Sequence, residues 1–241
     1  MVDGSAHARF ACRRLFAGAA LAGLLLGGCS TAVKEFFGVD EAESAASITD
    51  LGQYHDPLVL LNRANRLFDK RNYLEAALTY ERFLELHGLH RQADYAQFRV
   101  GLSHLKQFRS VDRDIEPVAK AVKAFQRFLA EYPNSLYAAE AQRRLGESRR
   151  HLADAELSVG RFYYRRQAYP AAIHRLEGVI KDYGDLPAAE AALYLLGRVY
   201  EDAGQADHAR AILQRLLTSY PNSGYRQQAQ EQLARLNGHS A

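Results

Sequence analysis

The sequence predicts an all-α fold, an α-solenoid in which antiparallel helix pairs stack one after another into a superhelix. Three observations predict it. The chain has 17 Gly and 6 Pro in 241 residues, fewer than an all-β chain with a turn every ten residues or so needs. Ala, Leu, Arg, Gln and Glu, which favour helices, dominate its body. Small residues also recur at fixed intervals, as repeat architectures require.

The recurring unit starts with a small residue and places a bulky residue three positions later and an alanine twelve positions later. The clearest copies start at Gly160 and Gly197 and reach Ala172 and Ala209 at this same step. The position four places after each alanine is bulky again, and a proline often ends the unit. This pattern resembles the tetratricopeptide repeat, in which a small residue stands where two helices cross.

Two earlier copies start at Ala64 and Gly101, separated by the same interval as Gly160 and Gly197. Ala64 is followed by Ala76 at the regular step, whereas Gly101 is followed only by Ala121, with a polar loop at 110–117 holding the extra eight positions. Closely packed helices need Gly or Ala where their backbones approach, because a larger side chain would separate them. We therefore expect about four repeats, with a C-terminal capping helix.

The expected helices follow from this register and from the turn signals between them. The repeated YPNS at 132–135 and 220–223 ends one helix at its proline and predicts that Ser135 and Ser223 cap the next. The stretch 135–166 is either one long helix or two collinear ones, and Gly146 suggests a degenerate repeat within it. The expected ranges are 57–70, 73–87, 92–108, 117–131, 135–166, 169–183, 187–203, 206–219 and 223–236.

The last expected helix resembles half a repeat. Its polar side chains are expected to form the outer cap that the end of a solenoid requires. They are Arg226, Gln227, Gln230 and Gln232.

The first 28 residues read as a lipoprotein signal peptide. Arg9, Arg13 and Arg14 form a basic region before an uncharged apolar run, Leu15 to Leu26, which is too short to span a bilayer. The LGGC at 26–29 resembles a bacterial lipobox. That resemblance implies that Cys29 becomes the mature N-terminus and carries S-diacylglycerol and an N-palmitoyl chain, enough for stable anchoring.

The predicted organisation is a signal peptide at 1–28, a flexible tether at 29–56 and a repeat domain at 57–241. Ser30, where Asp would favour retention in the inner membrane, points to the outer membrane. We therefore expect a lipid-anchored protein on the periplasmic face of the outer membrane. The alternative is an ordinary cleaved signal with a chance cysteine.

Charge and cysteine content exclude several kinds of function. The formal net charge is +3, of which residues 1–28 contribute +2 (three Arg and one Asp), leaving 28 basic and 27 acidic residues in the remainder. A nearly neutral body argues against nucleic-acid binding. Cys12 and Cys29 are the only cysteines, so a disulfide framework and a cysteine-rich zinc site are excluded.

Two segments carry a more specific resemblance. The segment 111–145 has an Asp-rich loop, an Ala-Phe helix and a YPxSxY turn, and 153–185 continues it. Both resemble the BamD family, tetratricopeptide-repeat lipoproteins of the outer-membrane β-barrel assembly machinery. The matching positions of the second segment are Glu156, Val159, Tyr163, Tyr164, Tyr169, Ala172 and Arg175.

The resemblance implies a scaffold with two kinds of partner. The C-terminal half would dock a POTRA domain of the BamA-like barrel-inserting subunit. The N-terminal half would help to receive C-terminal segments of unfolded barrel proteins. Known members have five repeats, whereas about four are expected here, and the missing one is N-terminal.

Candidate binding residues lie mainly in the long helical stretch. Arg143 and Arg150 are seven positions apart and share a helical face, and Arg161 and Arg165 extend the basic run. These arginines either dock an acidic partner or form a solvated face. Tyr164 is the fifth candidate, as one of a set of tyrosines that either line a peptide groove or pack the repeats. The others in that set are Tyr163, Tyr169, Tyr194 and Tyr200.

Catalysis and metal binding are not expected. His87 and His90 are three positions apart, but a metal site needs further ligands, and no nucleophile or phosphate-binding motif occurs. We expect no cofactor besides the covalent lipid. The leading hypothesis is the assembly scaffold, and the alternative is a repeat lipoprotein that coordinates peptidoglycan synthesis or secretin or pilus assembly. An envelope hydrolase with a helical fold is the third.

Overall fold

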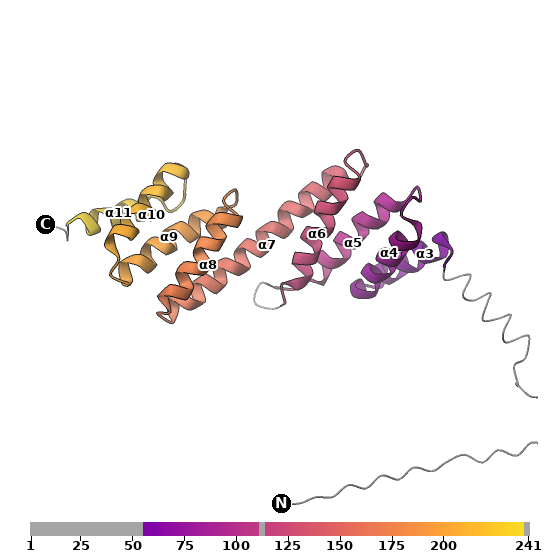
Figure 1. Ribbon diagram of the computed structural model, residues 1–241, viewed down its shortest axis with the longest axis horizontal. Helices are drawn as coiled ribbons and strands as arrows, with labels where there is room; N and C mark the ends of the chain where they lie inside the picture. Colours follow the sequence, from indigo (N-terminus) through magenta and orange to yellow (C-terminus); the bar gives the residue numbers. More distant parts are fainter. Residues whose placement is uncertain (1–54, 111–113, 239–241) are drawn as a thin grey trace, which may run out of the picture. The chain divides into compact units, whose positions relative to one another are not determined.

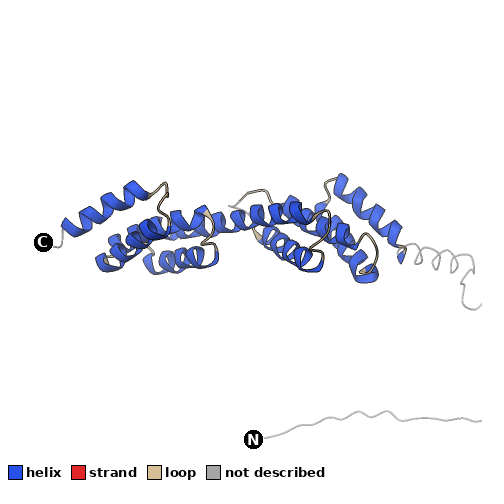
Figure 2. Ribbon diagram, turned by 90° about the horizontal axis from the view of Figure 1, so that it is seen from above, coloured by secondary structure: helices blue, strands red, loops and turns tan. Residues whose placement is uncertain are grey.

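A computed structural model describes residues 55–110 and 114–238, and within these ranges all regular secondary structure is helical, with no β-strand (Figure 2). The helices are α3 (Pro57–Asp69), α4 (Tyr73–His87), α5 (Ala93–Gln107), α6 (Glu116–Glu131), α7 (Ala138–Arg165), α8 (Tyr169–Asp182), α9 (Pro187–Asp202), α10 (Ala206–Ser219) and α11 (Arg226–Gly238). Every expected helix is confirmed, with ends that differ by at most three positions. None of these helices is long and apolar enough to cross a membrane.

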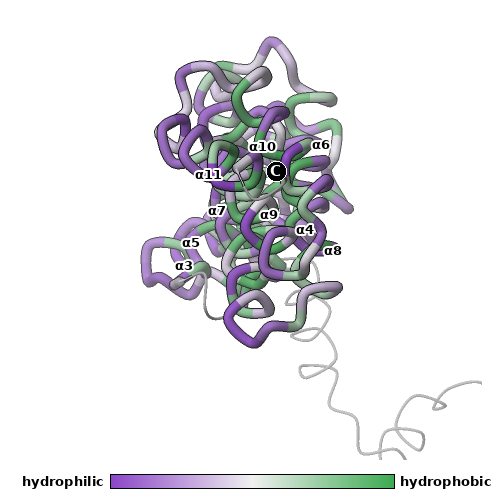
Figure 3. The backbone as a smooth tube through the Cα atoms, turned by 90° about the vertical axis from the view of Figure 1, so that its left-hand side faces the viewer, coloured by the Kyte–Doolittle hydropathy of each residue, from purple (hydrophilic) through white to green (hydrophobic). Residues whose placement is uncertain are grey.

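The helices pack in chain order as four antiparallel pairs followed by one more helix (Figure 1). The pairs are α3 with α4, α5 with α6, the second half of α7 with α8, and α9 with α10, and α11 packs on α10. Figure 3 shows hydrophobic and hydrophilic stretches alternating along the backbone, as expected of amphipathic helices. This confirms the predicted all-α repeat fold with four pairs and a final helix.

Helix α7 is one continuous helix of 28 residues, which decides between the two interpretations of 135–166. Its first half packs against α6 and its second half against α8, so it joins the second pair to the third. Gly146 does not mark a degenerate repeat, because a Cβ there would meet no described atom within 4 Å apart from its chain neighbours and the nearby α7 backbone. The suggestion that the small residue at 146 marks a helix crossing was therefore wrong.

The predicted close approaches occur at three glycines. A Cβ on Gly160 would lie 2.7 Å from Leu176 Cδ2, and one on Gly197 would lie 2.7 Å from Leu213 Cδ2. Each leucine follows its glycine at the same spacing along the chain, as the pattern requires. A Cβ on Gly101 would lie 2.6 Å from the ring of Phe125, which comes later in its unit because the α5–α6 connection is longer.

The turns inside three of the pairs share a left-handed residue seven positions after the small residue. Arg71, Gln167 and Gly204 have φ of 62°, 58° and 74°. In each turn the N–H of the following residue donates to a carbonyl five positions back, for example from Ala168 to Tyr163 at 3.1 Å. This closure is a Schellman-type helix end, and glycine suits the left-handed position best.

Replacing Gln167 by Gly is expected to stabilise the protein by about 0.5–1 kcal/mol, because a side chain is disfavoured in the left-handed region. Thermal melting followed by circular dichroism measures the change. The reverse substitution at the equivalent position, Gly204→Gln, is the control and should lower the melting temperature. A lower melting temperature for Gln167→Gly would contradict this account of the turn.

The YPNS turns differ in detail from the prediction. Helix α7 begins at 138 and α11 at 226, three positions after the serines that were expected to cap them. Each serine Oγ instead accepts from the N–H two positions ahead, Tyr137 or Tyr225, at 3.2 Å. A turn at 135–138 or 223–226 separates each serine from the helix. It is closed by a hydrogen bond from the last residue's N–H to the serine carbonyl, so the serines stabilise this turn and not the helix end.

The buried apolar side chains of the described residues form three clusters, one at α3 to α6, one at α5 to α7 and one at α7 to α11. The largest lies between α7 and α11 and includes Leu176, Leu193, Leu196 and Leu213. Gln232, which was expected on the polar outer cap, is buried within α11, and its Nε2 donates to Glu201 Oε2 at 2.6 Å. The prediction that Gln232 belongs to the polar outer cap was therefore wrong.

The predictions for the N-terminal region lie mostly outside the described residues. This applies to the signal peptide at 1–28, to Cys29 and to residues 29–54 of the tether. Asp56, at the end of the predicted tether, already belongs to the helical fold. Its Oδ1 accepts from the N–H groups of Leu58 at 2.8 Å and Val59 at 3.1 Å, which caps α3.

Candidate partner-binding surfaces

Helix α7 presents four of the five predicted residues on one face. Arg143, Arg150, Arg161 and Arg165 fall within about 60° around the helix axis and extend over about 33 Å of its length. We call these four residues the α7 basic face. It can attract an acidic surface over most of the helix.

Three arginines of the α7 basic face have no partner among the described residues. Arg143 pairs with Glu140 at 2.5 Å, in the way that a solvated helix surface commonly does. Arg150, Arg161 and Arg165 are exposed, and no ion pair or hydrogen bond engages their side chains within the described ranges. Exposed cations of this kind can contact a partner without first breaking an internal pair.

The remaining arginines of the stretch are engaged. Arg144 pairs with Glu140 at 2.8 Å and with Glu147 at 2.9 Å, and Arg166 lies 4.6 Å from the ring centroid of Phe162. Hydrogen bonds from Arg143 and Arg144 lower the pKa of the Glu140 carboxyl. For these positions the solvated-face interpretation is sufficient.

Tyr164 joins α7 to α9. Its hydroxyl donates to Asp202 Oδ2 at 2.6 Å, and the Arg198 guanidinium lies 5.6 Å from its ring centroid. Burial, and then the hydrogen bond to Asp202, raise the pKa of Tyr164 to about 12. The ring is half-buried and lies beside the exposed Arg198. Tyr164 therefore stabilises the packing of α7 against α9, and its role in binding stays a prediction.

The other tyrosines pack the repeats. Tyr163, Tyr169 and Tyr194 border the C-terminal core cluster and Tyr200 belongs to it. Tyr194 also stacks on Tyr225 with ring centroids 5.1 Å apart. This arrangement favours the packing interpretation for these four over a peptide groove.

The two histidines near the end of α4 pack on an aromatic ring. His87 and His90 lie 5.7 and 5.5 Å from the ring centroid of Phe83. His87 Nε2 also contacts the carbonyl of His55 at 2.7 Å. Across the part of the chain with described positions, no group of three or more His, Cys, Asp or Glu side chains is placed to hold a metal ion.

Charged pairs link α7 to the elements beside it. Arg149 contacts both carboxylate oxygens of Asp185, at 2.6 and 2.8 Å, and these hydrogen bonds lower the pKa of the Asp185 carboxyl. Arg175, one of the family-like positions, pairs with Glu156 at 3.2 Å. Arg175 and Glu156 line a hollow of about 470 Å³ beside α8 whose other charged lining side chains carry both signs.

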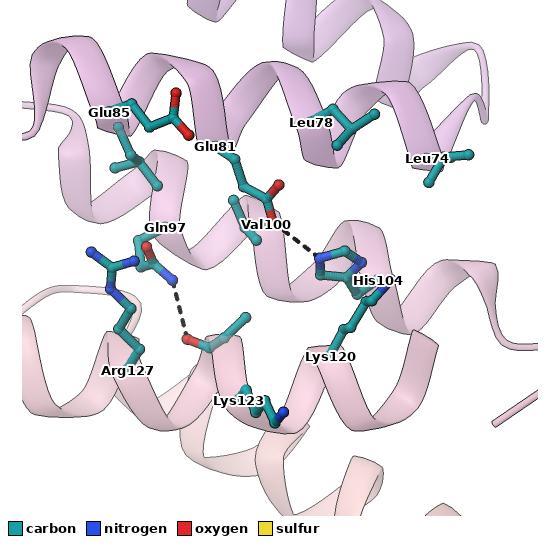
Figure 4. Close-up of a pocket in the computed structure, with 12 residues that line it drawn as sticks. Leu74, Leu78, Glu81, Glu85, Gln97, Val100, His104, Lys120, Lys123 and Arg127 are labelled. Atoms are coloured by element: carbon teal, nitrogen blue, oxygen red, sulfur yellow. Dashed lines mark hydrogen bonds and ion pairs between the residues drawn. The ribbon is translucent and has the colours of Figure 1, made fainter. Parts of the chain in front are cut away.

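A groove between α4 and α6 is the second candidate surface (Figure 4). Its volume is about 510 Å³ and α5 forms its floor. Leu78 on α4 lies opposite Lys120 on α6, and Lys123 lies further along α6, below Glu81. We call this feature the α4–α6 groove. Its α4 wall carries leucines together with Glu81 and Glu85, and its α6 wall is basic. It can accept an apolar side chain beside a carboxylate where the leucines face α6.

A family model described as YfiO, outer membrane lipoprotein, matches residues 52–212, which include most of the described helices. The chain belongs to this family of outer membrane lipoproteins. The predicted relationship to the BamD family is confirmed by curated relatives of that name. The family match covers the α4–α6 groove and the whole of the α7 basic face.

Two relatives illustrate the similarity. Outer membrane protein assembly factor BamD of Vibrio cholerae serotype O1 is 40% identical over 121 residues, which cover 46% of this chain and 50% of the relative. The protein of the same name from Rickettsia prowazekii is 30% identical over 132 residues, or 55% of this chain and 53% of the relative. The chain thus spans about half the length of the curated relatives it matches.

Among solved structures, the TPR2AB domain complex of yeast Sti1 aligns at 17% identity with a TM-score of 0.36. The alignment covers 77% of this chain and 71% of that chain. The repeat fold of this YfiO family member therefore rests on its own helix pairs and on the spacing of its glycines.

Sequence reasoning missed the α4–α6 groove and Arg198. One signal for the groove was present, because α4 carries leucines outside its buried stripe. A helix that buries one face needs only one apolar stripe, and Leu74 and Leu78 fall outside the stripe that contains Ala76 and Tyr80. No comparable signal marks Arg198, since its place beside Tyr164 depends on how α7 and α9 pack.

Proposed function

We propose that this protein is a non-catalytic scaffold of outer-membrane protein assembly. It is lipidated at Cys29, anchored on the periplasmic face of the outer membrane, and binds a barrel-inserting protein through one of that protein's POTRA domains. The observation that carries the proposal is the family membership together with three exposed arginines on α7 that no described side chain engages. The names of the relatives favour this role over peptidoglycan synthesis or secretin and pilus assembly.

The α7 basic face is the proposed docking surface. A rigid helix of 28 residues holds Arg150, Arg161 and Arg165 in a fixed line, so a partner with acidic groups at matching distances gains attraction without ordering a loop. Arg198 on α9 adds a fourth exposed cation beside Tyr164. The N-terminal pairs are the proposed region for receiving unfolded barrel proteins.

Reversing two charges tests the docking surface. The Arg161→Glu/Arg165→Glu variant is expected to lower recovery of the POTRA-containing protein about tenfold or more, because like charges oppose association. The full-length lipoprotein is purified from detergent-solubilised envelopes, and the co-purified proteins are quantified by mass spectrometry.

Arg91→Glu is the matched control, since Arg91 is exposed and precedes α5, so it is not part of the α7 basic face. Undiminished recovery with the double variant would remove the docking assignment. Recovery of a peptidoglycan synthase or a secretin in place of the POTRA protein would favour the alternative function.

A further inference from the structure

The α4–α6 groove has features that the scaffold role through α7 does not use. We propose that it is a docking site for a short acidic segment of a second protein, one that carries a large apolar side chain. The apolar side chain would lie against the α4 wall and the carboxylates against the α6 wall. This inference is independent of the α7 basic face, since no residue is shared between the two surfaces.

The apolar wall is exposed although α4 has a buried face elsewhere. Leu74 and Leu78 are each 56% exposed, and their spacing of four positions puts them on one side of the helix. The opposite side already supplies the core through Ala76, Tyr80 and Phe83, which are fully buried. The two leucines therefore contribute nothing to that core and remain available to an apolar side chain of a partner.

The basic wall supplies the charge complementarity. Lys120 and Arg127 make only exposed pairs within their own helix, with Glu116 and Glu131, each at 2.8 Å. Such pairs are weak and exchange readily. Lys123 has no ion pair or hydrogen bond among the residues whose positions are described. An incoming carboxylate thus meets Lys123 and, beside it, the weakly held Lys120.

Of the two acidic residues of the groove, Glu81 lies near its middle and Glu85 lies at the end away from Leu74. Glu81 contacts His104 at 3.3 Å, and Glu85 pairs with Arg82 at 3.0 Å (Figure 4). Leu78 faces Lys120, whereas Lys123 lies nearer the middle, below Glu81, and Arg127 lies at the Glu85 end. The α6 wall is therefore basic along its whole length, whereas the end of the α4 wall that holds Leu74 and Leu78 carries neither of these carboxylates. That end selects a ligand that combines an apolar side chain with a carboxylate.

The floor of the groove is already formed without a ligand. Gln97 Nε2 donates to the Ala124 carbonyl at 3.3 Å, and this bond joins α5 to α6. Val100 and His104 are buried beside it. A preformed floor lowers the cost of ordering on binding, and a volume of about 510 Å³ accommodates one or two large side chains.

Peptide selection tests the proposal directly. A random dodecapeptide library displayed on phage is selected on the full-length lipoprotein in nanodiscs, with counter-selection on the Leu74→Ser/Leu78→Ser variant. The expected consensus places Asp or Glu next to Leu, Ile or Phe. The corresponding synthetic peptide is then measured by fluorescence anisotropy, and its affinity should fall about tenfold for Leu74→Ser/Leu78→Ser and for Lys120→Glu/Lys123→Glu.

Leu89→Ser is the matched control, because Leu89 is fully exposed and lies outside the groove. It should bind the peptide as the unchanged protein does, and unaltered circular-dichroism melts will show that the groove variants are folded. Absence of a consensus, a basic consensus, or equal binding to the groove variants would overturn the proposal. None of these outcomes depends on whether the α7 basic face binds its partner.

Discussion

The Ala209→Asp variant is expected to lose about 3–5 kcal/mol of folding free energy. Ala209 is fully buried on α10 within the cluster that joins α7 to α11. A carboxylate placed there lies among apolar side chains, so the protein must desolvate the charge or protonate the group. Because each repeat contacts mainly its neighbours, the α9–α10 pair should open first.

Thermal melting and amide hydrogen exchange measure this loss. Ala211→Asp is the matched control on the same helix, since Ala211 is exposed, and it should change stability by only about 0.5 kcal/mol. Exchange protection in α9 and α10 should disappear in Ala209→Asp while α3 to α6 remain protected. Equal melting temperatures for the two variants would show that the repeat register is wrong.

Replacing Gly197 by Val should destabilise the protein by about 1–3 kcal/mol, because the crossing of α9 and α10 has no room for a side chain. The new Cβ would lie 2.7 Å from Leu213 Cδ2 and 2.8 Å from Leu213 Cγ. Leu213 is fully buried and cannot turn away, so the two helices must separate. Urea unfolding followed by circular dichroism provides the measurement.

The same substitution at Gly146 separates packing from helix propensity. A Cβ at that position would meet no described atom within 4 Å apart from its chain neighbours and the nearby α7 backbone. Gly146→Val should therefore stay within about 0.5 kcal/mol of the unchanged protein. A similar loss at both glycines would mean that valine harms the helix itself. The close approach at Gly197 would then carry no special weight.

Local sequence patterns were sufficient to predict the helices and their pairing. In each unit the leucine contacts the glycine of the same helix pair, from Gly160 to Leu176 and from Gly197 to Leu213. The spacing is therefore set within one repeat and is visible in the sequence. The same reasoning failed at Gly146, since a glycine marks a helix crossing only where another helix packs closely against it, and none does so at Gly146. It also failed at Gln232, whose burial depends on Glu201 in a neighbouring pair.

The binding surfaces were less predictable for a related reason. Periodicity placed Arg150, Arg161 and Arg165 on one face, but it could not show that Arg144 and Arg149 are engaged by Glu140 and Asp185. The α4–α6 groove combines residues of three helices, from Leu74 to Arg127. Such a surface exists only once the pairs have stacked. The pattern of one helix alone can indicate that α4 has exposed leucines, but not which residues of α5 and α6 lie opposite them.

Site-specific photocrosslinking in living cells tests the proposed scaffold role most directly. The photoreactive residue p-benzoylphenylalanine replaces Arg161 on α7, and the crosslinked product is identified by mass spectrometry. The account predicts a crosslink to the POTRA region of a large outer-membrane barrel protein, and no such product from the same residue at Arg91. A crosslink from position 161 to a peptidoglycan synthase or a secretin, with no POTRA product, would contradict it.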